Sequence, residues 1–415
     1  MQKVACRLQR GLGVDAVPRV RSAFSIHVVG VLVYDLLIVG GRVVDPSQGL
    51  DRRSDIAIRD GRIVAVEPKI DRDLAGQIVN ASGQLVTPGL IDLHVHVYPG
   101  VSHYGIDPDT YVLPSGVTTA LDAGSAGAST FEGLRRYVID VSNTRLFALL
   151  NISGMGMVSQ DVGELVDIRW ADPKAAIRMC EKHRDIILGV KLRMTRELAG
   201  ENGLQALKNA REAADAVGLP VMVHPQDAHC SLDDILHELK DGDIVTHCFH
   251  GMRGGILDRD GRVLESVRQA IDRGVRLDLG HGQGSFDFRV AEQALAQEVI
   301  PHTISSDLHA HNVDGPVFDL ATTISKFMLL GLDLSDAIHR CTSVPAEFLG
   351  MAGRIGTLVP GAHADVAIFD DEKGTHRFED AHGQTRIGEH RLVPHTVIKG
   401  GKEIAGIARG HVHQH

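Results

Sequence analysis

Two histidines, His94 and His96, lie at the end of an apolar stretch that begins at the turn residues Pro88 and Gly89. In a β-strand, residues two positions apart project to the same face, so the two imidazoles would lie side by side. A stretch that is apolar on both faces is typical of a parallel strand, and such strands carry their chemistry at the carboxyl end. The pair therefore predicts ligands for a metal ion.

The same spacing recurs at the end of the chain, in His411, His413 and His415. No apolar strand leads into these three residues, so we interpret them as a disordered terminus with loose metal affinity at most. Spacing alone therefore does not define a metal site, and the prediction depends on further residues.

Four further candidates end other apolar segments: Lys191, His224, His247 and Asp307. Each has an ordinary alternative. The lysine could extend to solvent or pair with a carboxylate, either histidine could be a satisfied core residue, and the aspartate could cap a helix. Because all four occupy the same position relative to a predicted strand, we expect them to meet at one edge of a sheet.

Four imidazoles, one carboxylate and one lysine are more than a single tetrahedral ion needs. They suit two divalent ions, by default Zn2+, about 3.5 to 4 Å apart with a hydroxide between them. An ammonium would be repelled there, but an amine neutralised by burial can add CO2, so we expect Lys191 to become a bridging carbamate. Asp307 would be both a ligand and the general base.

Strand-like and helix-length segments alternate between residues 89 and 355, which predicts an α/β fold, a (β/α)8 TIM barrel. Helices are expected over residues 172–184, 203–217 and 334–340. Eight strand candidates supply the number that closes such a barrel: 89–96, 117–123, 145–151, 186–191, 220–224, 243–247, 275–280 and 301–307.

Both ends of the chain instead show short strands and tight turns, at residues 36–45, 55–66, 364–370 and 395–404. Asp60 and Gly61, between two alternating runs, predict a hairpin. We therefore predict a discontinuous β-sandwich domain from residues 33–88 and 356–408, with the barrel, residues 89–355, inserted into it. Residues 1–32 loosely resemble a secretion signal but have no small-residue cleavage site before Tyr34, so a poorly ordered extension is favoured.

Composition narrows the class of protein. The 415 residues are 43% hydrophobic and contain no run of about 18 apolar residues, so no membrane association is expected. A net charge of −10 without basic runs gives no sign of nucleic-acid binding. The five cysteines are scattered, which indicates reduced thiols and a cytoplasmic location. We expect a small-molecule substrate and a homo-oligomer.

With these motifs, residues 34–404 resemble the amidohydrolase superfamily of binuclear metal-dependent hydrolases, and residues 88–96 form the most specific motif. The resemblance implies a (β/α)8 barrel with an appended β-sandwich. It also implies that His94, His96 and Asp307 hold the more buried metal, that His224 and His247 hold the exposed one, and that carboxylated Lys191 bridges the two.

Within the superfamily, the chain is similar to the dihydroorotase-like branch that also contains deacetylases. Dihydroorotases carry an arginine two residues after the second histidine, where this chain has Tyr98. Arg193 could instead hold an acidic substrate, with a surface ion pair as the alternative. His250 and Ser285 are predicted on the substrate side.

The resulting hypothesis is a hydrolase that removes acetyl or a similar acyl group from a small N-acyl or O-acyl acid. The first alternative is a cyclic amidase acting on dihydroorotate or hydantoin rings, which would differ only in the pocket. A deaminase is disfavoured, because that branch uses a glutamate where this chain has His250. A non-catalytic scaffold is disfavoured by the complete ligand set.

Overall fold

The structure is a computed structural model that describes residues 33–404. The predicted extension at residues 1–32, the terminal histidines at 411–415 and the last residues of the predicted β domain, 405–408, lie outside the described residues. The described part contains two sheets, one parallel and one mixed.

Seven parallel strands form the first sheet, in the order β12, β11, β10, β9, β8, β7, β6. Their bounds are β6 Leu90–Val95, β7 Val117–Gly127, β8 Arg145–Asn151, β9 Ile187–Arg193, β10 Val221–His224, β11 Ile244–Val245 and β12 Arg276–Leu277. Nearly every residue of β6, β7 and β10 is buried. The near-continuous apolar runs in the sequence arise because both faces of this sheet are covered.

The eighth predicted strand, residues 301–307, is not a named strand but joins the two edges of the sheet. Thr303 makes a parallel bridge to Asp278, just after β12, and Leu308 makes one to Val95 in β6. The carbonyl of Leu308 also accepts a hydrogen bond of 3.0 Å from the backbone N–H of His96. The curled sheet is therefore TIM-barrel-like, and its seam lies beside the two histidines.

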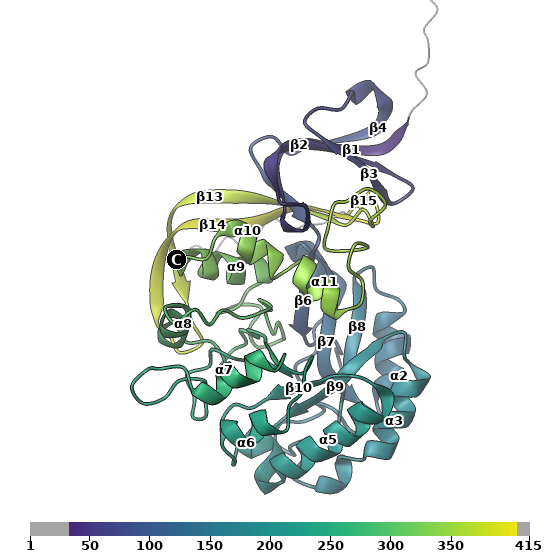
Figure 1. Cartoon of the computed structure of the whole chain (residues 1–415). Coiled ribbons are helices and arrows are strands. Elements are labelled where there is room, and N and C mark those ends of the chain that lie inside the picture. Colours follow the sequence, from purple (N-terminus) through teal and green to yellow (C-terminus); the bar gives the residue numbers. More distant parts are fainter. Residues whose placement is uncertain (1–32, 405–415) are drawn as a thin grey trace, which may run out of the picture. The chain divides into compact units, whose positions relative to one another are not determined.

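Helices follow most of the parallel strands (Figure 1). The three predicted helices are confirmed to within two residues, as α3 Pro173–Lys182, α5 Gly203–Val217 and α10 Leu334–His339. The others are α1 Pro108–Tyr111, α2 Phe131–Leu134, α4 Arg196–Ala199, α6 Leu232–His237, α7 Glu265–Asp272, α8 Phe288–Leu295, α9 Leu320–Leu329 and α11 Ser343–Phe348. None of the helices between residues 33 and 404 has the length and apolar character that crossing a bilayer requires.

Helix α5 shows how the sequence sets this packing. Four of its buried residues are alanines, Ala206, Ala210, Ala213 and Ala214, so one stripe of the helix is small and apolar. The stripe lets α5 approach β9 and α3 closely. The helix ends where Gly218 adopts a left-handed φ of 71°, which costs little without a side chain.

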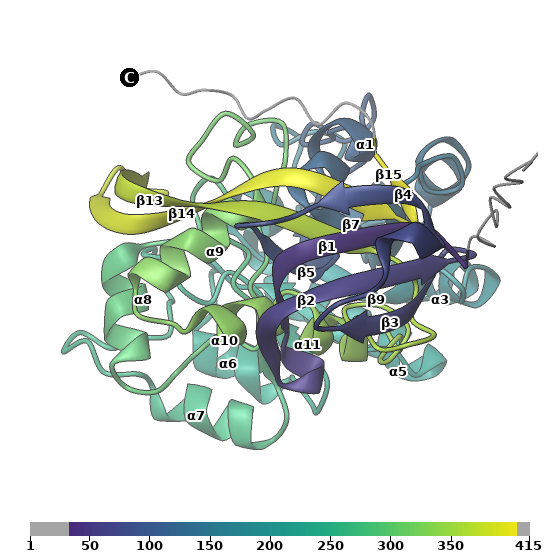
Figure 2. The same ribbon diagram turned by 90° about the horizontal axis from the view of Figure 1, so that it is seen from above.

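Strands from both ends of the chain share the second sheet, in the order β15, β14, β13, β5, β1, β2, β3, with β4 paired to β1 (Figure 2). Their bounds are β1 Tyr34–Asp45, β2 Leu50–Arg59, β3 Arg62–Glu67, β4 Ala75–Asn80, β5 Leu85–Pro88, β13 Val366–Glu379, β14 Thr385–Lys399 and β15 Lys402–Glu403. Alternate residues of β1 belong to separate apolar clusters, Leu36 and Ile38 to one and Leu37 and Val39 to another. Apolar side chains therefore lie on both faces of β1, and both ends of the chain contribute strands to one mixed sheet.

Two hairpins in this sheet test the turn predictions. Asp60 and Gly61 both have positive φ, 50° and 69°, between β2 and β3, so the predicted tight hairpin is confirmed. The β13–β14 hairpin is much longer than the predicted strands at 364–370 and 395–404. The hairpin extends beyond the other strands of the mixed sheet, and β14 packs against α9 (Figure 1).

Candidate metal centre

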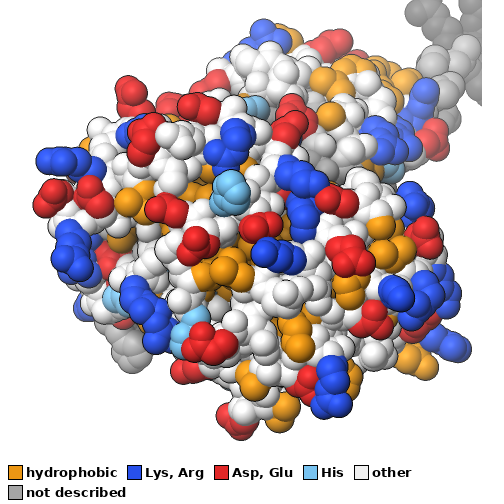
Figure 3. All heavy atoms as spheres, turned by 60° about the horizontal axis from the view of Figure 1, so that its bottom comes forward, with side chains coloured by type: hydrophobic (Ala, Val, Ile, Leu, Met, Phe, Trp, Pro, Cys, Tyr) orange, Lys and Arg blue, Asp and Glu red, His pale blue; other side chains and the backbone are white. Residues whose placement is uncertain are grey.

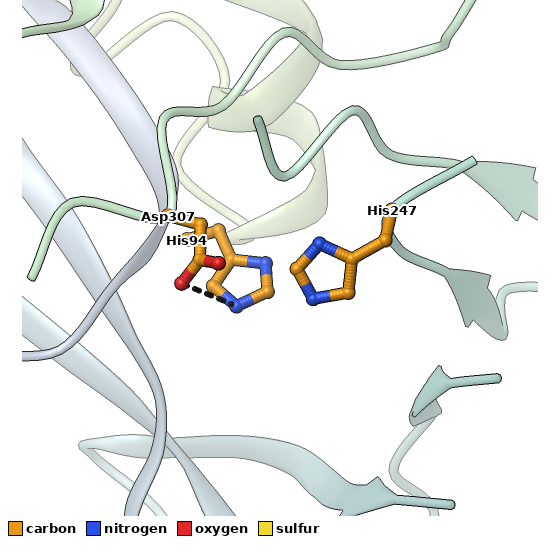
Figure 4. Close-up of side chains that lie close together, drawn as sticks. All are labelled: His94, His247 and Asp307. Carbon is orange, nitrogen blue, oxygen red and sulfur yellow. Dashed lines mark ion pairs between the residues drawn. The ribbon is translucent and has the colours of Figure 1, made fainter. Parts of the chain in front are cut away.

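The carboxyl ends of the parallel strands bring the predicted ligands together. His94, His247 and Asp307 are buried, and each offers a ligand atom within 4.8 Å of the other two (Figure 4). His96 joins this group, since its Nε2 lies 3.2 Å from Asp307 Oδ1. His224 stacks edge-on against His247, with the ring centroids 4.1 Å apart.

Two polar atoms of this cluster are buried without a hydrogen-bond partner, Asp307 Oδ1 and His224 Nε2. Asp307 Oδ1 faces the Nε2 atom of His94 at 3.5 Å as well as that of His96. Buried polar groups in proteins are nearly always paired, so these two atoms are suited to bind a metal ion. The alternative role of Asp307 as a helix cap is excluded, because no helix within residues 33–404 begins there.

Hydrogen bonds at the far side of the rings fix which nitrogen carries the proton. His247 Nδ1 donates to the carbonyl of Gly280 at 2.7 Å. His94 Nδ1 lies 2.9 Å from the hydroxyl of Thr246, which itself donates to Asp278 at 2.7 Å, so the hydroxyl oxygen accepts from the ring. Both rings therefore carry hydrogen on Nδ1 and turn an Nε2 lone pair inward, as metal-ligating histidines do.

Burial sets the charges of the cluster. It lowers the pKa of His94, His224 and His247 well below the ordinary value and that of His96 to about 3. Burial also raises the pKa of Asp307 to about 6. Neutral imidazoles converging on an unpartnered carboxylate supply electron pairs and no positive charge, which is the donor set that a divalent cation fits.

Lys191 lies two residues before the end of β9, rather than at its end as predicted. Its side chain is buried, and its Nζ lies 3.4 Å from His94 Nε2 and 3.4 Å from the sulfur of Met222. Within residues 33–404 it makes no ion pair with a carboxylate, so neither simple alternative for this lysine holds. Burial lowers the pKa of Lys191 to about 8, which makes the reactive free amine accessible near neutral pH.

Two of the cluster residues have strained backbones. His247 and Asp307 adopt φ angles of 59° and 50°, in the left-handed region that non-glycine residues seldom occupy. Such strain persists where the surrounding structure holds it and is concentrated at functional sites. Here it aims both side chains into the cluster (Figure 4).

Arg193 makes an ion pair, but the pair is buried rather than on the surface. Its Nε donates to Glu164 Oε1 at 2.7 Å, and its Nη2 contacts the same oxygen. The second oxygen of Glu164 accepts from Asn151 at 3.0 Å. The guanidinium also lies against Tyr104, 5.3 Å from the ring centroid.

The other predicted substrate residues occupy different surroundings. The hydroxyl of Tyr98 donates to the carbonyl of Thr130 at 2.9 Å, and that of Ser285 donates to Gln226 at 2.8 Å. His250 is buried in the loop after β11, and its Nδ1 has no hydrogen-bond partner. Of these three, His250 is the one whose side chain retains an unused polar atom.

Several residues at the site were not predicted from the sequence. His309 stacks on Tyr104 with ring centroids 4.2 Å apart and lies 6.3 Å from the His96 ring. Its spacing of two residues from Asp307 repeats the pattern of the first histidine pair and could have identified it. Glu164, in a long irregular loop, and Asp278, beyond a two-residue strand, follow no such pattern.

Known proteins are similar to this chain over most of its length. The sequence profile of the amidohydrolase family matches residues 85–404. A deacetylase of Enterococcus faecalis is 36% identical over 374 residues, which cover 89% of this chain and 98% of the relative. A deacetylase of Agrobacterium fabrum is 34% identical over 375 residues, which cover 89% and 91%.

Solved structures are similar in fold over the same extent. The crystal structure of an adenine deaminase has a TM-score of 0.82 at 34% identity and covers 89% of this chain and 99% of that one. The crystal structure of a dihydroorotase also has a TM-score of 0.82, at 33% identity, with coverages of 89% and 97%. The family profile, the relatives and the cluster at the strand ends lead to one conclusion: the chain belongs to the amidohydrolase family.

Proposed function

We propose that the chain is a metal-dependent deacetylase that cleaves an acyl amide or ester bond of a small N-acyl or O-acyl acid. The observation that carries this proposal is the unpartnered Oδ1 of Asp307, buried among imidazoles whose Nε2 atoms face it. The deacetylases among the relatives support the choice of bond.

The metal ligands would be His94, His96, Lys191, His224, His247 and Asp307. Two divalent ions, with Zn2+ as the expected metal, would supply Lewis acidity and a water that is ionised near neutral pH. For Lys191 to bridge them, its amine nitrogen would form a bond to the carbon of CO2 and release a proton, leaving a carbamate anion. Its burial and the absence of an ion-pair partner within residues 33–404 favour that reaction.

Asp307 would move the proton. Its carboxylate would accept a proton from the attacking water and then donate it to the leaving nitrogen or oxygen. In the metal-free protein, burial raises the pKa of Asp307 to about 6, which is nearer to neutral pH than the pKa of an ordinary carboxyl group. The opposite oxygen, Oδ2, packs against Gly282, where a Cβ atom would lie only 2.5 Å away, so the carboxylate has little freedom to turn.

Substrate contacts are proposed for Arg193, Tyr98, His250 and Ser285. The Glu164 carboxylate already neutralises Arg193, so an acidic substrate would have to share this guanidinium. His250, with its free and buried Nδ1, is the simplest hydrogen-bond donor or acceptor for a substrate.

For the whole chain we propose a (β/α)8 barrel at residues 89–355 and a β-sandwich domain at 33–88 and 356–408. We also propose a homo-oligomer in the cytoplasm, where the four described cysteines, all unpaired, would stay reduced. On the face shown in Figure 3, acidic and basic side chains are interspersed without a patch of one sign.

The test is hydrolysis of a divided panel by protein supplied with zinc and bicarbonate. N-acetyl and O-acetyl acids form one arm, dihydroorotate and hydantoins the second, and adenine the third. Turnover confined to the acyl arm supports the proposal, whereas turnover confined to either other arm contradicts it.

A further inference from the structure

A second buried lysine lies outside the metal centre and joins three separate segments. Lys326, in α9, is 1% exposed and makes no ion pair within residues 33–404. Its Nζ instead donates to three neutral acceptors: the Nε2 of His281 at 2.8 Å and the carbonyls of Pro316 and Glu379, each at 2.7 Å. All three hydrogens of the ammonium are therefore used, and each acceptor belongs to a different segment.

The first segment is the loop after β12, which packs directly on Asp307. The backbone N–H groups of His281 and Gly282 donate to the carbonyls of Ser305 and Ser306, at 3.1 and 3.0 Å, immediately before Asp307. Gly282 adopts a φ of 58°, and a Cβ atom there would lie 2.5 Å from Asp307 Oδ2. The position of this loop therefore sets the room available to the carboxylate.

The second segment is the loop that follows Asp307. The side-chain amide of Asn312 donates to the carbonyl of Asp307 at 2.8 Å, and its backbone carbonyl accepts from Gly315 at 3.1 Å. Pro316, which accepts from Lys326, comes next. The ammonium therefore binds both the loop that packs on Asp307 and the loop that follows Asp307.

The third segment is the tip of the β13–β14 hairpin, which extends from the mixed sheet over the barrel (Figure 1). Besides the carbonyl of Glu379, Asp380 accepts from the backbone of Phe288 at 3.0 Å, and the N–H of Ala381 donates to Phe286 at 3.0 Å. The hairpin tip therefore holds the far end of the same β12 loop.

We propose that Lys326 is a positioning residue for the reaction, which locks the two loops beside Asp307 to the β13–β14 hairpin and so keeps Oδ1 of Asp307 aimed at the histidines. The proposal rests on the proposed function for the role of Asp307. The linkage of the three segments does not depend on which substrate is cleaved.

The test compares Lys326→Met with Lys399→Met in the full chain. Lys399 is the matched control, because it is also a largely buried lysine but pairs with Asp365 in the mixed sheet at 3.0 Å. Lys326→Met is expected to lower kcat at least about tenfold and to change KM less than about threefold, because small misplacement of a reacting group is costly. Lys399→Met should lower Tm and leave kcat near that of the wild type.

Hydrogen exchange gives a readout that needs no substrate. The amides of His281 and Gly282 should exchange at least about tenfold faster in Lys326→Met, since loss of the ammonium frees the loop, and at the wild-type rate in Lys399→Met. Metal content per chain, measured on the same samples, shows whether a lower kcat comes from loss of metal or from misplacement of Asp307.

If Lys326→Met does not fold, a second variant tests the same linkage between the segments. His281→Asn has too short a side chain to reach Nζ and leaves the two carbonyl contacts of Lys326 in place. Faster loop exchange and lower kcat in this variant support the proposal, and wild-type values of both overturn it. If the substrate panel disproves the proposed function, the exchange result still decides the linkage, and kinetics are measured on whichever compound the wild type converts.

Discussion

Asp307 differs from the buried carboxylates of the mixed sheet in how its oxygens are paired. Asp365, immediately before β13, accepts from Arg145, Lys399 and Gly400. Asp55, in β2, accepts from two backbone N–H groups, one on each oxygen. In the metal centre, the buried Oδ1 of Asp307 has no hydrogen-bond partner. Satisfied carboxylates stabilise the fold, whereas the unsatisfied one is kept available for a ligand.

Buried lysines show the same contrast. Lys399 contacts a carboxylate, and burial still lowers its pKa to about 8. Lys191 contacts an imidazole and a thioether instead. Lys191 is fully buried and Lys399 is largely buried, and only Lys399 pairs with a carboxylate. Substitution of Lys399 should therefore mainly lower stability, and substitution of Lys191 should mainly lower activity.

The largest expected effect is that of Asp307→Asn. Removing the proton acceptor should lower kcat about 10³-fold while the circular dichroism spectrum stays that of the wild type. Asp365→Asn is the control and should lower Tm with kcat unchanged. Near-normal kcat in Asp307→Asn would remove this residue from the mechanism.

The Arg193–Glu164 pair gives the next largest effect. Glu164→Gln leaves a buried guanidinium without its counter-charge and should lower the free energy of unfolding by about 3 kcal/mol, measured by denaturant titration. The exposed pair between Arg169 and Asp167 provides the comparison, and Asp167→Asn should leave the unfolding midpoint unchanged. Equal effects in the two variants would show that Arg193 is not held as described.

Lys191→Met tests the bridging role. With no amine to carboxylate, kcat should fall about 10²-fold, the loss expected when a metal-centre ligand is disturbed. Wild-type protein supplied with 13C-labelled bicarbonate should show a carbamate carbon signal that the variant lacks. A variant with wild-type kcat, or the signal retained in it, would contradict the bridge.

The smallest effect is a pH dependence of the metal-free protein. The pKa values of the four cluster histidines are lowered on folding, so the unfolded chain binds more protons below about pH 6.5 and stability falls as pH falls. The raised pKa values of Asp92, Asp278 and Asp307 act in the opposite direction as the pH falls towards 4. The buried histidines with a lowered pKa outnumber these carboxyl groups, because they also include His250, His281 and His309.

Denaturant unfolding between pH 7 and pH 5 should therefore show a loss of at least about 1 kcal/mol per pH unit. The double variant His224→Gln, His247→Gln should have a shallower slope. A wild-type profile that is flat over this range would mean that the histidines are not buried as neutral rings.

Much of the metal centre could be predicted from the sequence. The ends of apolar strands and the residue types that bind metals are both recognisable in short stretches of sequence. The apolar runs before His94, His224 and His247 identified the strands and the edge where they meet. The eighth strand was predicted as regular but forms only isolated bridges around Thr303 and Leu308. Its backbone turns sharply at Asp307, where the φ of 50° interrupts pairing.

Other features depend on contacts that the sequence pattern does not encode. The pairing of Arg193 with Glu164 joins β9 to an irregular loop, so periodicity gives no signal for it. The extent of the β13–β14 hairpin depends on α9 beneath it, and its polar residues gave no strand pattern. For the same reason the three acceptors of Lys326 could be found only in the folded chain.

The measurement that tests the metal centre most directly is the metal content of protein grown with zinc, compared with His224→Gln, His247→Gln. Neutral donors around an unpartnered carboxylate predict about two ions per chain in the wild type and at most about one in the double variant. Wild-type protein without bound metal, or with the same content as the variant, would contradict the assignment of this cluster as a binuclear centre.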